Sequence, residues 1–219
     1  MRVYKFNSFI SIFLVLILAC FTLFSCRQNS PQHYYKNGSA KYQLKFYSGA
    51  IIDFEKAIEL KPDFADAYYA KAICESELKQ YENALTDFNK VLELEPTNKD
   101  AIFSRAFYIK EKTGDFKGAI QDYNKFIELN KNGDNAFAYN NRGFSKFKIN
   151  DLEGAIKDIE KSILLNPKNS FAYKNRALVY IAIDSLNQAC EDLNKAVGLG
   201  FTKEYGKEAE ELINKYCNR

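Results

Sequence analysis

Ala50-Ile-Ile-Asp-Phe-Glu-Lys56 is the stretch that decides the fold, because close copies of it recur along the chain. Each copy keeps the alanine, the aspartate and the lysine: Ala84-Leu-Thr-Asp-Phe-Asn-Lys90, Ala119-Ile-Gln-Asp-Tyr-Asn-Lys125, Ala155-Ile-Lys-Asp-Ile-Glu-Lys161 and Ala189-Cys-Glu-Asp-Leu-Asn-Lys195. The leading alanines are 34, 35, 36 and 34 residues apart. A repeat of that length is typical of a solenoid, in which each unit buries its apolar face only against its neighbours. Solenoids mostly bind other molecules, so the repeat favours recognition over catalysis.

Each repeat is predicted to form two helices. In the first repeat, Ile51, Phe54, Ile58 and Leu60 follow helical spacing, and Pro62 closes the unit where a helix can no longer continue. Small residues recur on both helices and allow the pair to approach closely: Gly38, Ala72, Ala106, Gly143 and Ala177 on the first helices, and Ala50, Ala84, Ala119, Ala155 and Ala189 on the second. A large side chain at these positions would force the pair apart.

This pattern resembles the tetratricopeptide repeat. The fourth unit shows the resemblance well, with Tyr139, Gly143, Ala155, Ile159 and Pro167 in place. The resemblance implies an all-α solenoid of about five helix-turn-helix units, within residues 32–200: 32–63, 64–97, 98–133, 134–168 and 169–200. The third unit departs from the pattern, with a first helix one residue longer, no closing proline and two extra residues before the next helix. We therefore expect an irregularity near the junction of the third and fourth units.

Residues 201–219 are predicted to form a C-terminal capping helix. Tyr205, Ala209, Leu212, Ile213 and Tyr216 make an apolar stripe among charged residues, as the terminal cap of a solenoid requires. In an exported chain, Cys190 on the last repeat and Cys217 on the cap could form a disulfide. Two reduced, buried thiols are the alternative, because a sequence does not give the distance between the two Cα atoms.

Residues 1–25 are predicted to be an export signal. Arg2 and Lys5 precede an apolar run from Phe9 to Phe24, and polar residues follow Cys26 at once. A helix of that run would be roughly 24 Å long, shorter than the ~30 Å hydrocarbon core of a bilayer. A cleaved signal is therefore favoured over a retained transmembrane anchor.

Leu23-Phe24-Ser25-Cys26 resembles the lipobox of bacterial lipoproteins, which implies that Cys26 is acylated and begins a short linker, residues 26–31. Ile17-Leu18-Ala19-Cys20 is a poorer match, because it would leave Phe21 to Phe24 on the mature end. An ordinary cysteine after a secretory signal is the alternative. All of these interpretations place the repeats outside the cytoplasm. By the sorting rule of the bacterial lipoproteins that this motif resembles, Arg27 and Gln28 after the cysteine, with no acidic residue, imply the outer membrane, facing the periplasm.

An acid and a base recur together in the repeats. The acids are Asp53, Asp87, Asp122, Asp158 and Asp192, and the bases, on four of the five first helices, are Lys71, Arg105, Arg142 and Arg176. We expect these residues to form a ladder of ion pairs along the helix–helix seams, each guanidinium forking onto a carboxylate. A row of ligand-binding charges is the alternative.

The resemblance implies that the first helices line a concave groove that binds a partner. By register, the groove residues are Tyr35, Tyr69, Phe103, Asn140 and Lys174 at one position, Ile73, Phe107, Phe144 and Leu178 a turn later, and Asn141 and Asn175 alongside. The lysines and asparagines of the family's clamp for a terminal carboxylate do not line up here. We therefore expect an apolar or amphipathic segment anchored in aromatic pockets. For each aromatic residue, a place in the core between helices is the alternative.

Other classes of function find little support. Net charge is +3, and +1 for a chain that begins at Cys26, without the clustered basic stripe that nucleic acid requires. His33 is the only histidine, and there is no Cys-x-x-Cys pair, glycine-rich phosphate loop or nucleophile elbow. We expect that the chain is not an enzyme and that it binds no metal, cofactor or small-molecule substrate.

The sequence favours a lipid-anchored extracytoplasmic scaffold that binds a protein or peptide. The alternatives are an accessory subunit of an envelope assembly or secretion machine, and a glycan- or peptidoglycan-binding protein.

Overall fold

The computed structural model describes residues 30–217, which form helices and turns with no strand among them. The predicted leader, residues 1–25, and the predicted acylation site Cys26 lie outside the described residues. Within the described range, no helix combines the length and the hydropathy that crossing a membrane requires. The predicted all-α architecture is confirmed. The chain divides into two compact units, unit 1 ending at Leu94 and unit 2 beginning at Glu95.

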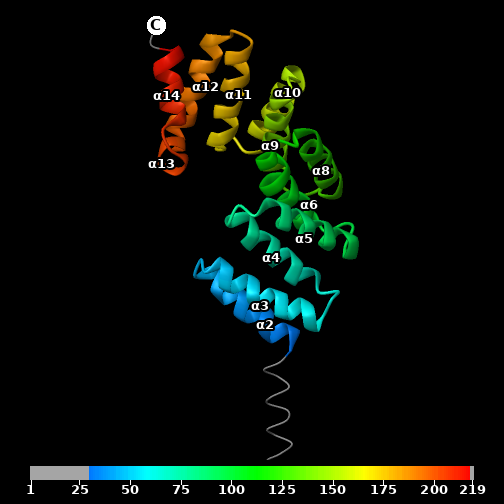
Figure 1. Ribbon diagram of the computed structural model, residues 1–219. Helices are drawn as coiled ribbons and strands as arrows, with labels where there is room; N and C mark the ends of the chain where they lie inside the picture. The colour runs from blue at the N-terminus through cyan, green and yellow to red at the C-terminus, as the bar shows by residue number, and fades with distance from the viewer. Residues whose placement is uncertain (1–29, 218–219) are drawn as a thin grey trace, which may run out of the picture. The chain divides into compact units, whose positions relative to one another are not determined.

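The described part of unit 1 forms two helix–turn–helix pairs (Figure 1). Helix α2 (Pro31–Gln43) packs against α3 (Tyr47–Leu60), α4 (Ala65–Glu77) packs against α5 (Tyr81–Leu94), and α3 joins the pairs by contacting α4. The Ser30 side chain caps α2 by accepting the backbone N–H of His33 at 3.1 Å. Helix α3 ends at Leu60, two residues before Pro62, where the sequence predicted the end of the first repeat.

Unit 2 continues with three more pairs. The first pair joins α6 (Lys99–Ser104), η1 (Arg105–Lys110) and α7 (Glu111–Thr113) to α8 (Phe116–Leu129). The next pairs are α9 (Ala136–Lys148) with α10 (Leu152–Leu165), and α11 (Ser170–Ala182) with α12 (Leu186–Gly198). Asp115 and Asp151 cap α8 and α10 by accepting the N–H groups of Gly118 and Gly154.

The irregularity of the third repeat lies partly inside its first helix. Residues Arg105–Lys110 form a π-helix between two α-helical segments. A π turn absorbs an inserted residue without breaking the helix, which accounts for the extra residue of this arm. The two extra residues before α9 lie in a loop that Asn130 and Asn135 hold together, since the Asn135 side-chain amide donates to the Asn130 carbonyl at 2.9 Å.

Small residues form the seams between paired helices, as their recurrence predicted. The ten seam residues are all buried: Gly38, Ala50, Ala72, Ala84, Ala106, Ala119, Gly143, Ala155, Ala177 and Ala189. At Gly143, an added Cβ would lie 2.7 Å from Ile159 Cγ1 and 3.0 Å from the Ala155 carbonyl oxygen. A side chain there would push α9 away from α10, at a cost of about 1–3 kcal/mol.

The prediction of one capping helix over residues 201–219 is wrong. The segment forms two helices, α13 (Phe201–Tyr205) and α14 (Glu208–Tyr216). Gly206 separates them with φ 95°, a left-handed conformation that glycine adopts freely and that ends a helix. Phe201 and Ala209 are buried and extend the apolar core of α11 and α12. The segment therefore caps the last repeat with two short helices.

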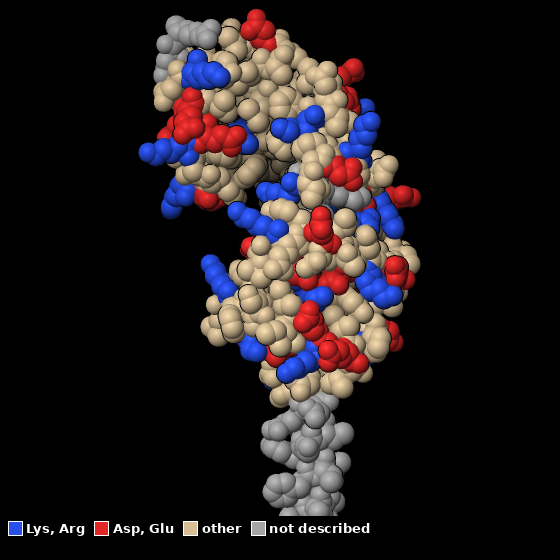
Figure 2. Space-filling view, in the orientation of Figure 1, with Lys and Arg blue, Asp and Glu red and all other residues tan. Residues whose placement is uncertain are grey.

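Charged side chains of both signs are interspersed over the face of the molecule that Figure 2 shows. A protein that binds nucleic acid would gather its lysines and arginines in a stripe or patch. That face carries no such patch. Its mixed charge agrees with the small net charge of the sequence, +3.

Candidate functional site

The four predicted base–acid pairs lie in contact between the two helices of each pair. Three arginines hold an aspartate through Nε and Nη2, with N–O distances of 2.6–2.9 Å: Arg105 with Asp122, Arg142 with Asp158 and Arg176 with Asp192. Lys71 Nζ lies 3.0 Å from Asp87 Oδ2. These four aspartates are only 4–5% exposed. Their burial assigns the ladder to the helix–helix seams.

Asp53 has a partner that the repeat pattern did not predict. Asn37 occupies the ladder position of the first repeat, so that repeat has no base in register. Lys41, one turn later on α2, supplies the charge instead, with Nζ 2.6 Å from Asp53 Oδ2. A signal was present in the sequence, because Lys41 stands three residues after the seam residue Gly38 and Lys146 stands three after Gly143.

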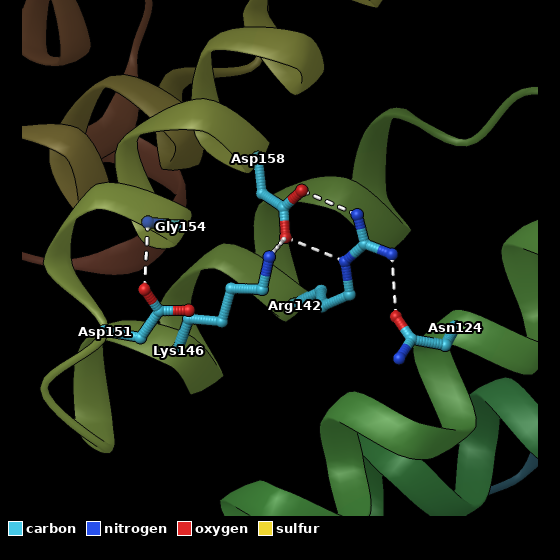
Figure 3. Close-up of polar contacts among 6 residues, drawn as sticks. All are labelled: Asn124, Arg142, Lys146, Asp151, Gly154 and Asp158. Carbon is cyan, nitrogen blue, oxygen red and sulfur yellow. Dashed lines mark hydrogen bonds and ion pairs between the residues drawn. The ribbon is translucent and has the colours of Figure 1, made fainter.

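Lys146 makes the fourth repeat different from the others. Its Nζ lies 2.8 Å from Asp158 Oδ2, so Asp158 has two cationic partners, Arg142 and Lys146 (Figure 3). Arg142 also donates from Nη1 to Asn124 Oδ1 on α8 at 2.7 Å. This arginine therefore connects α9 to its own partner α10 and to the preceding repeat.

The contact with the preceding repeat recurs at two other ladder positions. Arg176 Nη1 lies 3.8 Å from Glu160 on α10, and Lys71 Nζ lies 3.7 Å from Glu55 on α3. Glu55, Asn124 and Glu160 occupy equivalent places two residues after the ladder aspartates. In a solenoid, stability depends on contacts between neighbouring repeats. The ladder supplies such contacts in addition to closing each helix pair.

Glu75 brings a second carboxylate to the ladder of unit 1. It occupies on α4 the position that Lys41 and Lys146 take in their repeats, and it is 3% exposed. Lys71 Nζ lies 3.5 Å from Glu75 Oε1 and 3.0 Å from Asp87 Oδ2. Burial, and then the negative charge of Asp87, raise the pKa of Glu75 to about 7, although Lys71 opposes the shift.

We expect Glu75→Gln to stabilise unit 1 more at pH 8 than at pH 5. The raised pKa of Glu75 means that its protonated form favours folding, fully below the ordinary pKa of 4.5 and no longer once the pH passes about 7. Glutamine stays uncharged throughout, so its advantage grows as the pH rises. Urea unfolding at the two pH values measures this advantage, with Glu82→Gln, an exposed carboxylate on α5, as the control. An equal difference from the parent chain at both pH values would contradict the assignment.

The predicted groove residues of unit 1 are all half-buried. The Tyr35 ring lies 5.7 Å from that of Phe54 and 5.2 Å from that of Phe64 and packs with the core, and burial raises the pKa of its phenol. Tyr69 and Ile73 are half-buried on α4, and Tyr69 meets Phe88 edge to face at 5.8 Å. All three predicted residues of this unit are therefore half-buried, and Tyr35 and Tyr69 both pack on core phenylalanines.

In unit 2, three predicted groove residues are buried, and the expectation that they face a partner is wrong. Asn140, Lys174 and Asn175 are 1%, 5% and 3% exposed. Asn175 Nδ2 donates to Asn140 Oδ1 at 3.0 Å, and Asn140 Nδ2 donates to Asn141 Oδ1 at 3.0 Å. The physical reason is that α9 and α11, first helices of successive repeats, contact each other directly. The two hydrogen bonds link the asparagines in a chain within the interface between those helices, although Asn175 Oδ1 is buried without a hydrogen-bond partner.

Lys174 is enclosed by aromatic rings and by the cap. Its Nζ lies 5.2 Å from the ring centroid of Phe171, 5.6 Å from that of Phe201 and 5.9 Å from that of Phe144. Glu208, at the start of α14, supplies a carboxylate 3.2 Å from the same Nζ. The positive charge of Lys174 is therefore paired with a carboxylate of the capping segment. The sequence pattern predicted that this segment covers the apolar core, but not that it supplies an ion pair.

Of the remaining predicted groove residues of unit 2, one packs against the core and four remain candidates for contact with a partner. The Phe103 ring lies 5.6 Å from that of Tyr123 and 5.1 Å from that of Phe126, which places it against the core. Four other residues on successive first helices are half-buried: Phe107, Asn141, Phe144 and Leu178. We call these four the unit 2 recognition surface.

Cys190 and Cys217 are joined by a disulfide, with their Cα atoms 5.7 Å apart. Cys190 lies on α12, and Cys217 follows α14 directly. The bond therefore fastens the capping segment to the last repeat. Cys74 is a buried free thiol on α4, and burial raises its pKa to about 12.

Two surface depressions of unit 2 have linings that contain none of the four residues of the recognition surface. One, of about 570 Å³, is lined by Lys99 and by the end of α8 with its loop, residues 128–133. Another, of about 450 Å³, lies between α9 and α10 around Tyr139 and Leu164. Neither lining contains a predicted groove residue. Among residues 30–217, no group of three or more His, Cys, Asp or Glu side chains is placed to hold a metal ion.

Comparisons with known proteins identify the repeat and the fold. Sequence profiles of the tetratricopeptide repeat match residues 33–64, 65–98, 101–132 and 138–169, more than half of the chain. A comparison with curated proteins gives no match.

Several solved structures share the architecture. MamA from Desulfovibrio magneticus is 19% identical, with a TM-score of 0.73 over 80% of this chain and 97% of that one. YrrB, described as a TPR protein with an unusual peptide-binding site, is 19% identical, with a TM-score of 0.70 over 87% and 97%. A tetratricopeptide repeat protein from Parabacteroides merdae is 22% identical, with a TM-score of 0.62 over 88% and 74%. At these identities the likeness establishes an α-solenoid of stacked helical hairpins.

Proposed function

Because the chain belongs to the tetratricopeptide repeat family, whose fold supports protein–protein interaction, we propose that it is a non-enzymatic scaffold that binds a segment of another protein. The observation that carries the proposal is the unit 2 recognition surface. Phe107, Phe144 and Leu178 are only half-buried on successive first helices, while the charged ladder beside them is buried. Aromatic and aliphatic side chains held partly open on a rigid scaffold are the usual anchors of an interface.

The chemistry of this surface favours an amphipathic ligand. Apolar ligand side chains would pack on Phe107, Phe144 and Leu178, and the Asn141 side chain would hydrogen-bond the ligand backbone. Lys112 Nζ lies 6.0 Å from the Phe107 ring centroid, and Lys148 Nζ lies 5.8 Å from that of Phe144. These lysines favour acidic residues next to the apolar anchors. The peptide-binding site described for YrrB supports a peptide as the ligand.

We further propose that the chain is exported and anchored by a lipid on Cys26, at the outer membrane and facing the periplasm. The charged start, the apolar run and the Leu23-Phe24-Ser25-Cys26 motif support this proposal. The disulfide between Cys190 and Cys217 also supports it, because such bonds persist in oxidising compartments outside the cytoplasm.

Photo-crosslinking in living cells tests the scaffold. We expect a photoreactive residue in place of Phe107 to capture a protein, whereas the same residue in place of Lys161, exposed on α10, does not capture it. Leu178→Glu should reduce the capture at position 107 while the thermal unfolding of the chain stays unchanged. Capture in fixed stoichiometry would indicate an accessory subunit of a larger assembly. The same products from positions 107 and 161, or none from position 107, would contradict the proposal.

A further inference from the structure

The turn between α2 and α3 exposes three large apolar side chains within five residues. Tyr42 is 38% exposed, Leu44 80% and Phe46 58%. The residues equivalent to Leu44 in other repeats are much less exposed, with Leu78 at 37% and Ile183 at 42%. An exposed apolar residue thus recurs at this position, but this turn exposes the most apolar surface, with Tyr42 and Phe46 beside Leu44.

Phe46 also departs from the local rule for a helix start. The equivalent residues before α5, α8, α10 and α12 are all polar: Gln80, Asp115, Asp151 and Ser185. Asp115 and Asp151 cap their helices through the side chain, whereas Phe46 makes no side-chain cap for α3. Ser185 before α12 makes no side-chain cap either, so the feature particular to Phe46 is its aromatic ring, which lies against Gly49 and is still 58% exposed. Local rules are broken in this way mainly where a function requires it.

Along the chain on either side of this turn, the charged side chains of residues 31–52 are all basic, although Glu77 of α4 lies near Tyr42. Residues 31–52 contain Lys36, Lys41 and Lys45 and no aspartate or glutamate. Lys41 is paired with Asp53, whereas Lys36 and Lys45 are exposed, and Lys45 lies between Leu44 and Phe46 with φ 59°. Figure 2 shows the tip of this hairpin, at the left edge of unit 1, as mostly uncharged surface with a basic side chain beside it. The turn is therefore both apolar and cationic.

The proposed anchor keeps this turn close to a bilayer. Cys26 precedes Ser30 by four residues, which span at most about 14 Å. Helix α2 has 13 residues and is therefore about 20 Å long. A lipid on Cys26 thus holds the far end of α2 within about 35 Å of the surface, and the turn reaches the surface when α2 lies along it.

We propose that the α2–α3 turn, residues 42–46, contacts the anionic lipid surface to which Cys26 tethers the chain, an inference that rests on the proposed anchor. The three apolar side chains enter the boundary between headgroups and acyl chains, where aromatic residues are enriched. Lys36 and Lys45 meet the anionic headgroups. A second copy fits less well, because a symmetric contact would bring the lysines of both copies together.

Tryptophan fluorescence tests the contact, since the chain contains no tryptophan of its own. The full chain, produced with its leader, carries Leu44→Trp, or Ile183→Trp as the matched control in the α11–α12 turn. It is reconstituted in vesicles of phosphatidylethanolamine and phosphatidylglycerol with brominated acyl chains. We expect the indole at position 44 to be blue-shifted and quenched several-fold more than the indole at position 183. Adding Lys45→Gln should lower the ratio of lipid-bound to free turn about fivefold.

Flotation of the chain with the vesicles on a density gradient measures the lipid anchor independently of the turn, with Cys26→Ser as the control that lacks the anchor. A parent chain that does not float with the vesicles would overturn the anchor and the turn contact together. Flotation with equal quenching at positions 44 and 183 would overturn the turn contact alone. A blue shift that depends on protein concentration in lipid-free detergent would overturn the lipid contact in favour of a second copy. Phe46→Trp repeats the measurement at a position that keeps an aromatic ring.

Discussion

Replacing Arg176 by leucine is expected to lower the free energy of unfolding of unit 2 by about 3–5 kcal/mol. Arg176 holds Asp192 through two hydrogen bonds, of 2.7 and 2.8 Å, and Asp192 is 5% exposed. Leucine would leave that carboxylate buried without its forked partner, and the loss of one member of a buried ion pair is costly because the remaining charge stays desolvated. Urea unfolding, followed by helical circular dichroism, measures the change.

The fourth repeat provides the matched comparison. Arg142→Leu removes the same kind of fork, but Lys146 remains 2.8 Å from Asp158 and keeps that carboxylate paired. We therefore expect Arg142→Leu to cost clearly less than Arg176→Leu. The double variant Arg176→Leu/Asp192→Leu should recover much of the lost stability, because it removes both charges. Equal losses for the two single variants, or a loss below about 1 kcal/mol for Arg176→Leu, would contradict a structural ladder.

Positions that recur in every repeat could be predicted from the sequence. Ala50 and its four equivalents had to lie between helices, because a small residue kept at one register position marks close approach. Asp122 and Arg105 could be paired by the same logic, since an acid and a base that recur together are neighbours in each unit. Repetition within one chain thus supplies several observations of each structural role. The α-solenoid and most of the ladder follow from it.

Features that belong to a single repeat could not be predicted in the same way. Lys41 replaces the missing ladder base of the first repeat, and Glu208 reaches Lys174 from a segment outside the repeats. Gly206 divides the cap through one backbone conformation. Asn140 and Asn175 stand at repeat positions where groove residues are expected, yet the direct contact of α9 with α11 buries them. The candidate site is therefore smaller than the register implied, because the angle between neighbouring repeats, which a sequence does not give, decides which side chains stay open.

Opening the disulfide between Cys190 and Cys217 is expected to lower the stability of the cap by about 3–4 kcal/mol. The bond closes a loop between residues 27 positions apart, and its loss restores conformational freedom to the unfolded segment. For a chain of this size, the midpoint of thermal unfolding should fall by roughly 10 °C in reductant. Hydrogen exchange should rise first in residues 201–217, because only the packing of Ala209, Leu212 and Ile213 and the Glu208–Lys174 ion pair are then left to hold α14.

The double variant Cys190→Ser/Cys217→Ser separates the disulfide from other effects of the reductant. It should unfold at the reduced midpoint whether or not reductant is present, and the buried thiol of Cys74 is unchanged in it. Intact mass after alkylation without reductant should show both cysteines blocked in the parent chain. If reductant exposes both thiols but neither the midpoint nor the exchange of residues 201–217 changes, then packing against α12 alone holds the cap. In that case the covalent bond makes no measurable contribution to the end of the solenoid.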